Sequence, residues 1–193
     1  MLKSSRELII FTLFALVALP VLAQDGQLSP AGAPGCGPDQ VNFEVKASKG
    51  AITAQHEAGK ALVYFIEDDS DFNSVPKPTT RAGLDGQWVG ATHGNSYLYF
   101  EVDPGVHHFC ASWQGHAHSG ISMLAGVSSG YGSKAAASSF TAEAGSVYYF
   151  VAKNIFYQRE NSSNKVDLSL IQLNSDEGQL MVSRSTFSIS KKK

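Results

Sequence analysis

A stretch in the middle of the chain constrains the fold most, because three short strand-like runs are separated there by tight turns. Residues 87–89 follow the turn dipeptide Asp85-Gly86, and residues 96–102 alternate with a period of two. Asp103-Pro104-Gly105 ends that run, because proline cannot donate to a strand ladder and glycine accepts a positive φ. Residues 106–113 form the third run. The pattern predicts β-strands joined by turns.

Runs with the same period of two recur elsewhere in the chain. They predict further strands over 41–47, 140–142, 146–153 and 166–173, while the nearly all apolar, β-prone run at 61–66 predicts a central strand. We expect the turn at 143–145 to join two of these runs as a hairpin. Ser175 is placed to cap a short helix over 176–183. The spacing favours a single antiparallel β-sandwich, immunoglobulin-like or prealbumin-like, with a short C-terminal helix.

The turn and strand residues carry a resemblance to a known family. The motifs are Asp85-Gly86-x-Trp88-Val89-Gly90, Gly94-x-Ser96-Tyr97-x-Tyr99 and Pro104-Gly105-x-His107. The region from Lys60 to Val182 resembles the bacterial exported domain of unknown function 2846 family, and it is similar to PEGA-type β-sandwich modules. The resemblance implies a fold and a location at the cell envelope, but no activity. It also implies that His107 packs or hydrogen-bonds at its turn.

Residues 1–23 have the order of a signal peptide. A basic start precedes an apolar run over 8–22 and an A-x-A-like site that ends at Ala23. A retained membrane anchor is the alternative, but the run is shorter than the roughly 18–20 residues needed to span a bilayer, and Pro20 interrupts it. We therefore expect export to the periplasm, the cell envelope or the outside of the cell. No transmembrane segment is expected after cleavage.

The rest of the chain divides into two parts. Residues 24–40 are rich in Gly, Pro, Ala and Gln and predict a flexible leader, and residues 41–190 predict the sandwich domain. The whole chain has a net charge of −2. Removal of a signal peptide with two basic residues and one acidic residue makes it −3, so no basic face is available for nucleic acid.

Cys36 and Cys110 are the two cysteines of the chain. An exported protein meets oxidising conditions, so an even count predicts a disulfide between them. The alternative is a pair of unpaired thiols.

Four histidines lie close together in the sequence, at 107, 108, 116 and 118. His116 and His118 would share one face of an extended chain, which is a usable spacing for copper or zinc. His107 and His108 would point to opposite faces, and no carboxylate lies within the run. We expect no metal and no other cofactor, with His116 and His118 as the candidates if a site exists. A metal-dependent or hydrolytic enzyme that uses the His107–His118 cluster is the alternative function.

Two other motifs fall short of a known chemistry. Residues 126–130 match the G-x-S-x-G elbow of hydrolases, but no histidine follows Ser128. The acidic run Glu67-Asp68-Asp69-x-Asp71, which we expect on a surface loop, lacks the glycine and the spacing of an EF-type calcium loop. It leaves only weak surface calcium binding open.

Aromatic residues are the remaining signal of a binding surface. The candidates are Trp88, Tyr97, Tyr99 and Tyr149, because exposed aromatic rows on a sheet stack on sugars or on a partner protein. The alternative is cross-strand packing that only stabilises the sheet. We also expect residues 115–138, which are rich in Gly and Ser, to be the most mobile part of the domain.

The sequence therefore predicts an exported, non-enzymatic β-sandwich module. Its expected role is that of a structural or binding component of the bacterial cell envelope. Its expected partner is an envelope protein or a polysaccharide.

Overall fold

The structure is a computed structural model that describes residues 35–48, 54, 57–70, 77–114, 130–131, 135–157 and 165–193. Its elements are β1 (Phe43–Ala47), β2 (Ala61–Asp68), β3 (Thr79–Leu84), β4 (Gln87–His93), β5 (Ser96–Val102), β6 (Gly105–Trp113), β7 (Gly130–Tyr131), β8 (Ala135–Ala142), β9 (Val147–Tyr157), β10 (Lys165–Leu173), α2 (Ser175–Arg184) and β11 (Thr186–Lys192). The prediction of an all-β fold with a short C-terminal helix is confirmed. Within these residues, no helix has the length and apolar character of a membrane span.

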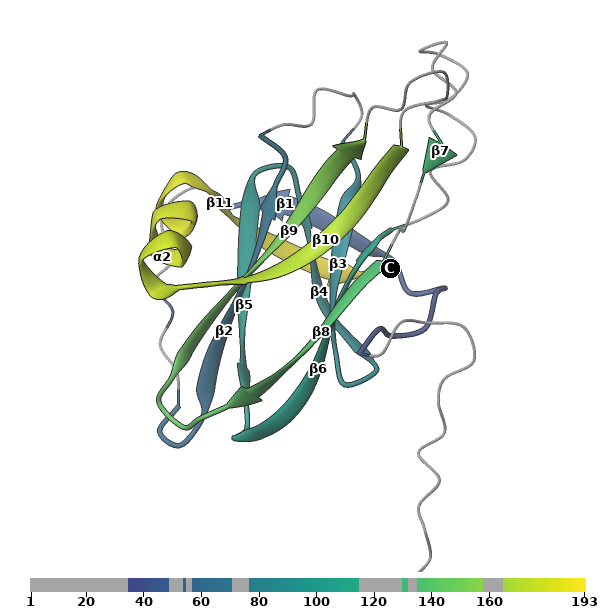
Figure 1. Cartoon of the computed structure of the whole chain (residues 1–193). Coiled ribbons are helices and arrows are strands. Elements are labelled where there is room, and N and C mark those ends of the chain that lie inside the picture. The colour runs from purple at the N-terminus through teal and green to yellow at the C-terminus, as the bar shows by residue number, and fades with distance from the viewer. Residues whose placement is uncertain are drawn as a thin grey trace, which may run out of the picture.

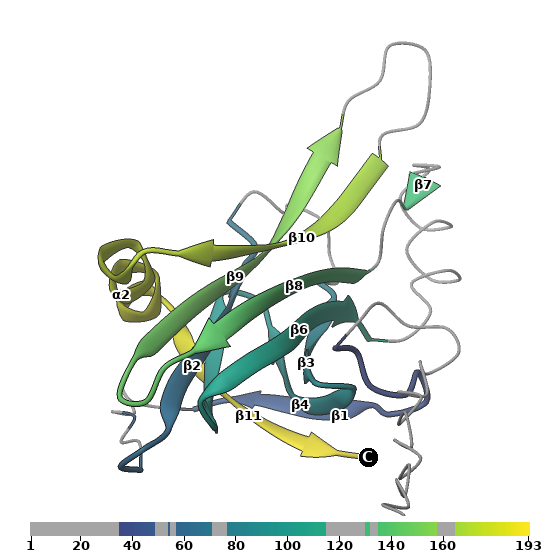
Figure 2. The same cartoon turned by 60° about the horizontal axis from the view of Figure 1, so that its bottom comes forward.

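The strands form two sheets (Figures 1 and 2). The larger sheet has seven strands in the order β1-β11-β5-β2-β9-β10-β7, and the smaller has four in the order β4-β3-β6-β8. Most neighbours are antiparallel, as predicted. The pairs β2–β9, β5–β11 and β7–β10 are parallel, which the prediction of an antiparallel fold did not include.

Aromatic side chains from both sheets meet in one core. Phe65 from β2 and Phe150 from β9 contact Phe109 from β6 with their rings at right angles or nearly so. The ring centroids are 5.7 Å apart for Phe65–Phe109 and 4.9 Å apart for Phe109–Phe150. Ala111 and Trp113 join the same core, so these alternate positions of β6 face inward. Burial of this apolar surface holds the two sheets together.

The predicted hairpin at residues 143–145 is wrong. The turn is present, with Gly145 at a φ of 78°, but it connects β8 of the four-stranded sheet to β9 of the seven-stranded sheet. The links from β4 to β5 and from β5 to β6 also pass between sheets. A turn motif fixes where the chain reverses, and the burial of each strand then decides which neighbour it pairs with.

The structure also differs from the expectations in one strand's extent, in one additional strand and in one helix cap. Residues 135–138, expected in a loop, belong to β8 and pair with β6. Residues 186–192, for which no strand was predicted, form β11 between β1 and β5. The cap of α2 is Asn174 rather than Ser175, because the Asn174 side chain accepts a hydrogen bond from the Glu177 backbone at 2.9 Å. Within the expected loop, Gly130 and Tyr131 form β7, while residues 115–129 and 132–134 and the predicted signal peptide lie outside the described residues.

The end of the predicted leader is fastened to the outer face of the four-stranded sheet. We call residues 35–42 the strap. The predicted disulfide between Cys36 and Cys110 is confirmed. The indole nitrogen of Trp88 donates to the Pro38 carbonyl at 2.7 Å. A Cβ at Gly37 would lie 2.5 Å from the Trp88 ring, so only glycine allows the strap to approach this closely.

A buried arginine completes the attachment of the strap. The Arg81 guanidinium donates to the carbonyls of Asp39 and Val41 at 3.0 and 2.9 Å. It also lies 4.2 Å from the centre of the Trp88 ring, which is a cation–π contact. Burial lowers the pKa of Arg81, which the charge of Asp39 opposes. The positive charge of Arg81 is therefore stabilised by backbone carbonyls of the strap and by the Trp88 ring. Detachment of the strap would remove those carbonyls and expose the Trp88 ring to solvent.

Helix α2 packs on the outer face of the seven-stranded sheet through a glycine. Gly178 is buried, and a Cβ at this position would overlap the ring of Tyr149 on β9. The absence of a side chain therefore sets the distance between helix and sheet.

We predict that Gly178→Ala destabilises the protein, although alanine has the higher helix propensity. The gain in propensity is about 1 kcal/mol, whereas overpacking against Tyr149 costs about 1–3 kcal/mol and moves the helix. Denaturant titration measures the net loss. Ser183→Ala, an exposed substitution in the same helix whose hydroxyl donates to Leu180 within that helix, is the matched control. A gain in stability for Gly178→Ala would show that the helix moves without cost.

Candidate functional site

Five aromatic rings gather on the outer face of the seven-stranded sheet. They come from the adjacent strands β11, β5, β2 and β9 and are Phe187, Tyr97, Tyr99, Tyr64 and Tyr149. We call this surface the tyrosine face. On β2, Tyr64 points away from Val63 and Phe65, which are in the core, because successive side chains of a strand point to opposite faces.

The rings of the tyrosine face contact one another directly. Tyr64 is stacked on Tyr149 with centroids 5.0 Å apart and planes 12° apart. Tyr64 lies 5.8 Å from Tyr99, which lies 5.4 Å from Phe187. Burial raises the pKa of Tyr64, and the neighbouring phenols of Tyr149, Tyr97 and Tyr99 raise it further. The four tyrosines of this surface therefore combine apolar rings with hydroxyl groups that can form hydrogen bonds.

The four predicted binding aromatics do not share one surface. Trp88 is 4% exposed and lies beneath the strap on the other sheet. Tyr97 and Tyr149 belong to the tyrosine face but are 4% and 7% exposed, so they support it from below. Tyr99 is half-buried and contributes to the accessible surface. Tyr64, which was not among the candidates, is also half-buried and occupies the centre.

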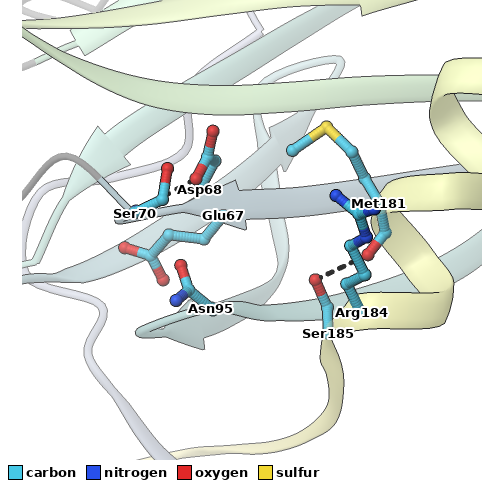
Figure 3. A pocket seen from close by; sticks show the side chains of 7 residues that line it. All are labelled: Glu67, Asp68, Ser70, Asn95, Met181, Arg184 and Ser185. Atoms are coloured by element: carbon cyan, nitrogen blue, oxygen red, sulfur yellow. Dashed lines mark hydrogen bonds between the residues drawn. The ribbon is translucent and has the colours of Figure 1, made fainter.

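A polar pocket borders the tyrosine face (Figure 3). Its volume is about 310 Å³, and it is lined by Glu67, Asp68, Ser70, Asn95, Met181, Arg184 and Ser185. The residues come from the end of β2, the turn between β4 and β5, and the end of α2. Met181 also packs against the tyrosine face, so the pocket and the aromatic surface are continuous.

Two carboxyl groups of the acidic run are buried, which corrects the expectation of a surface loop. Glu67 accepts a hydrogen bond from the Thr80 hydroxyl at 2.5 Å. Asp69 accepts one from the Asn154 amide at 2.8 Å, and the Asn154 oxygen accepts from the Trp113 indole at 3.1 Å. These bonds tie the two sheets together at one end. The sequence shows the acidic residues, but it does not show that β2 continues past Ile66 and that Glu67 and Asp69 are buried between the sheets.

Burial changes the ionisation of both groups. It raises the pKa of Glu67 well above its usual value, and the negative charge of Asp69 raises it further, against hydrogen bonds from Thr80 and Thr92. Burial also raises the pKa of Asp69, which the charge of Lys77 and the hydrogen bond from Asn154 oppose. Asp68 points to the other face of β2 and forms an ion pair with Lys153 at 3.5 Å.

His107 is held by two acidic residues in turns. Its Nδ1 lies 2.7 Å from the Asp85 carboxylate, and its Nε2 lies 2.7 Å from the Asp103 carbonyl. Asp85 has a φ of 48° and also accepts from the backbone of His108 at 2.8 Å. Burial lowers the pKa of His107, but the bonds to Asp85 and Asp103 outweigh it and raise the pKa above its usual value. Both ring nitrogens are engaged, so His107 hydrogen-bonds at its turn as its motif position implied.

The other chemical candidates cannot be placed. His116, His118 and Ser128 lie outside the described residues, as does Asp71. Within the described part of the chain, no group of three or more His, Cys, Asp or Glu side chains is arranged to hold a metal ion.

Comparison of the chain with protein-family models, with curated proteins and with solved structures found no match. The resemblance of residues 60–182 to the domain of unknown function 2846 family therefore stays an expectation.

We predict that His107→Ala lowers stability by about 1–2 kcal/mol at about pH 6, because it removes hydrogen bonds to Asp85 and Asp103. The folded pKa is raised, so this contribution is fully present below the unfolded value of about 6.5 and is lost as pH rises through the folded pKa. Denaturant titrations across pH measure it. His108→Ala is the control, since its exposed ring is replaced while its backbone bond remains. A loss that grows with pH would contradict the assignment.

We predict that Glu67→Gln gains stability relative to the unsubstituted protein as pH rises. The folded pKa of Glu67 is raised, so ionisation opposes folding from about pH 4.3 up to the folded pKa. Each pH unit within that window costs the unsubstituted protein about 1.4 kcal/mol, which the amide avoids. Unfolding free energies between about pH 5 and pH 8 test this. The exposed Glu143→Gln should follow the unsubstituted profile; parallel profiles for Glu67→Gln would refute the prediction.

Proposed function

We propose that this protein is an exported, non-enzymatic β-sandwich module, of immunoglobulin-like or prealbumin-like type, that binds a polysaccharide of the bacterial cell envelope through its tyrosine face. The observation that carries the proposal is the half-buried pair of Tyr64 and Tyr99, which lie side by side on the outer face of a sheet.

The chemistry of the tyrosine face suits a sugar chain. The flat apolar faces of the rings stack on the C–H faces of sugar rings, and the clustered phenol hydroxyls exchange hydrogen bonds with sugar hydroxyls. The rings are held rigidly by stacking on Tyr149 and by contact with Phe187, so binding orders few side chains. The adjoining pocket adds carboxylate, amide and guanidinium groups that fix orientation.

Two features support export and a binding role. The disulfide between Cys36 and Cys110 is compatible with an oxidising compartment, and residues 1–23 have the order of a signal peptide. The histidine at 107, on which the alternative enzyme would depend, already has both ring nitrogens bonded within the protein. The binding module therefore requires fewer assumptions than the metal-dependent or hydrolytic enzyme.

We predict that Tyr64→Ala and Tyr99→Ala each weaken polysaccharide binding by about 5- to 30-fold, which corresponds to a loss of about 1–2 kcal/mol per ring. The measurement is retention of the mature protein on immobilised peptidoglycan, chitin and cellulose, followed by calorimetry with the oligosaccharide of the polymer that retains it. Circular dichroism confirms that each variant is folded.

The control is Val106→Ala, since Val106 is 68% exposed on the opposite sheet. It should bind as the unsubstituted protein does. Equal binding by the tyrosine variants would exclude the tyrosine face as the site. Failure to bind any of the polysaccharides, with capture of envelope proteins instead, would replace the polysaccharide by a protein partner.

A further inference from the structure

Two carboxyl groups lie between the sheets at the end of β2. Glu67 and Asp69 follow Phe65 at alternate positions, so all three side chains point to the same side of the strand. Glu67 and Asp69 are each 1% exposed. Burial of a carboxylate is costly unless a cation or a set of hydrogen bonds compensates it.

Each of these carboxyl groups keeps one oxygen without a hydrogen bond in the described part of the chain, although the Thr80 and Thr92 hydroxyls both act on Glu67. Glu67 Oε1 accepts from the Thr80 hydroxyl, but Glu67 Oε2 has no hydrogen-bond partner within the described residues. Asp69 Oδ1 accepts from Asn154, but Asp69 Oδ2 likewise has none there. The Asn154 amide is fixed with its NH₂ toward Asp69, because the Trp113 indole on its other side can only donate. Both groups are therefore held in place with an unsatisfied oxygen.

The surrounding charges leave the pair short of positive charge. Lys77 acts on both carboxyl groups through its charge, and His93 and Asp68 act on Asp69. Lys77 nevertheless makes no hydrogen bond to Glu67 Oε2 or Asp69 Oδ2, the two unsatisfied oxygens. The negative charge of Asp69 acts on Glu67, and both side chains point to the same side of the chain, so a cation bound between them would offset this repulsion.

The polar pocket reaches the first of the two residues, Glu67. Glu67 and Asn95 line it together, and Figure 3 shows their polar side-chain groups close to each other beside the end of β2. The Asn95 oxygen accepts from the backbone of Asp69 at 2.8 Å, which ties the pocket wall to the second carboxyl. Asn95 thus brings a neutral amide oxygen beside Glu67 and next to the backbone of Asp69.

We propose that Glu67 and Asp69 bind a hard divalent cation of the Ca²⁺ or Mg²⁺ class, with Glu67 Oε2 and Asp69 Oδ2 as charged ligands and the Asn95 oxygen and water as neutral ligands. All of these donors are oxygens, which calcium and magnesium prefer, and one or two carboxylates with water are a usual magnesium set. The described residues offer no thiolate or imidazole cluster here, so zinc and copper are the wrong class. The site differs from the weak surface calcium binding left open by the sequence, because it lies between the sheets.

The test is calorimetric titration of the chelator-treated protein with CaCl₂ and, separately, MgCl₂, together with melting curves in each ion and in EDTA. One site per chain is expected, with a dissociation constant on the order of 10⁻⁵ to 10⁻³ M and a higher melting temperature in the bound form. The ion with the lower dissociation constant in these two titrations is the one that the site prefers. No binding and no change in melting temperature with either ion would overturn the proposal.

Variants locate the site. Glu67→Gln and Asp69→Asn should each weaken binding by at least about tenfold, the effect of losing one charged ligand. Asp68→Asn is the matched control, because this neighbouring carboxylate points to the other face of β2 and pairs with Lys153. Because the Asp68 charge acts on Asp69, this variant should also bind more weakly, but by several-fold less than a variant that lacks a ligand. Equal losses of affinity in all three variants would show only a general electrostatic attraction of cations to the acidic run. That result would overturn the proposal.

A second measurement keeps the proposal testable if either variant fails to fold. Trp113 reaches Asp69 through one amide, so its indole lies near the proposed ion. Tb³⁺, a luminescent substitute for Ca²⁺, should emit when the aromatic residues of the unsubstituted protein are excited, and millimolar Ca²⁺ should remove the emission. Two results would contradict the proposal. One is Tb³⁺ emission at full strength in Trp113→Phe, and the other is no Tb³⁺ emission from the unsubstituted protein.

Discussion

The pairing of β2 on both edges is the constraint on which the rest of the structure depends. Because β5 and β9 flank it, β2 is covered along its length, and its two faces are forced into different roles. Inward positions supply Phe65 to the core and then the buried carboxyl of Glu67. Outward positions supply Tyr64 to the tyrosine face and Asp68 to the pocket. A slip of one residue would exchange all of these at once.

The sequence predicted local geometry better than it predicted pairing. The period of two placed the strands over 96–102 and 106–113, and a continuous apolar run placed the central strand at 61–66. The even cysteine count, with the expectation of export, predicted the disulfide. The hairpin at 143–145 failed, because a turn motif contains no information about which sheet receives each strand. β11 was missed because its run ends in the charged tail of the chain, and its partners β1 and β5 are far away in the sequence.

The candidate site was predictable only in part, and for the same physical reason. Tyr99 could be named from its strand, but the exposure of an aromatic ring depends on what covers it. Trp88 is covered by the strap, and Tyr149 is covered by a helix that approaches through Gly178. The buried position of Asp69 depends on Asn154, which is 85 residues away in sequence. Such contacts follow from the packing of distant segments, which no local pattern reports.

The strap and the tyrosine face lie on the outer surfaces of opposite sheets. The strap is joined to the four-stranded sheet by Cys36 and Arg81, while the tyrosines belong to the seven-stranded sheet. Gly35, where the strap begins, therefore lies on the face of the domain away from the aromatic rings. The two outer faces are thus independent surfaces, since a molecule that contacted the strap would leave the half-buried rings of Tyr64 and Tyr99 uncovered.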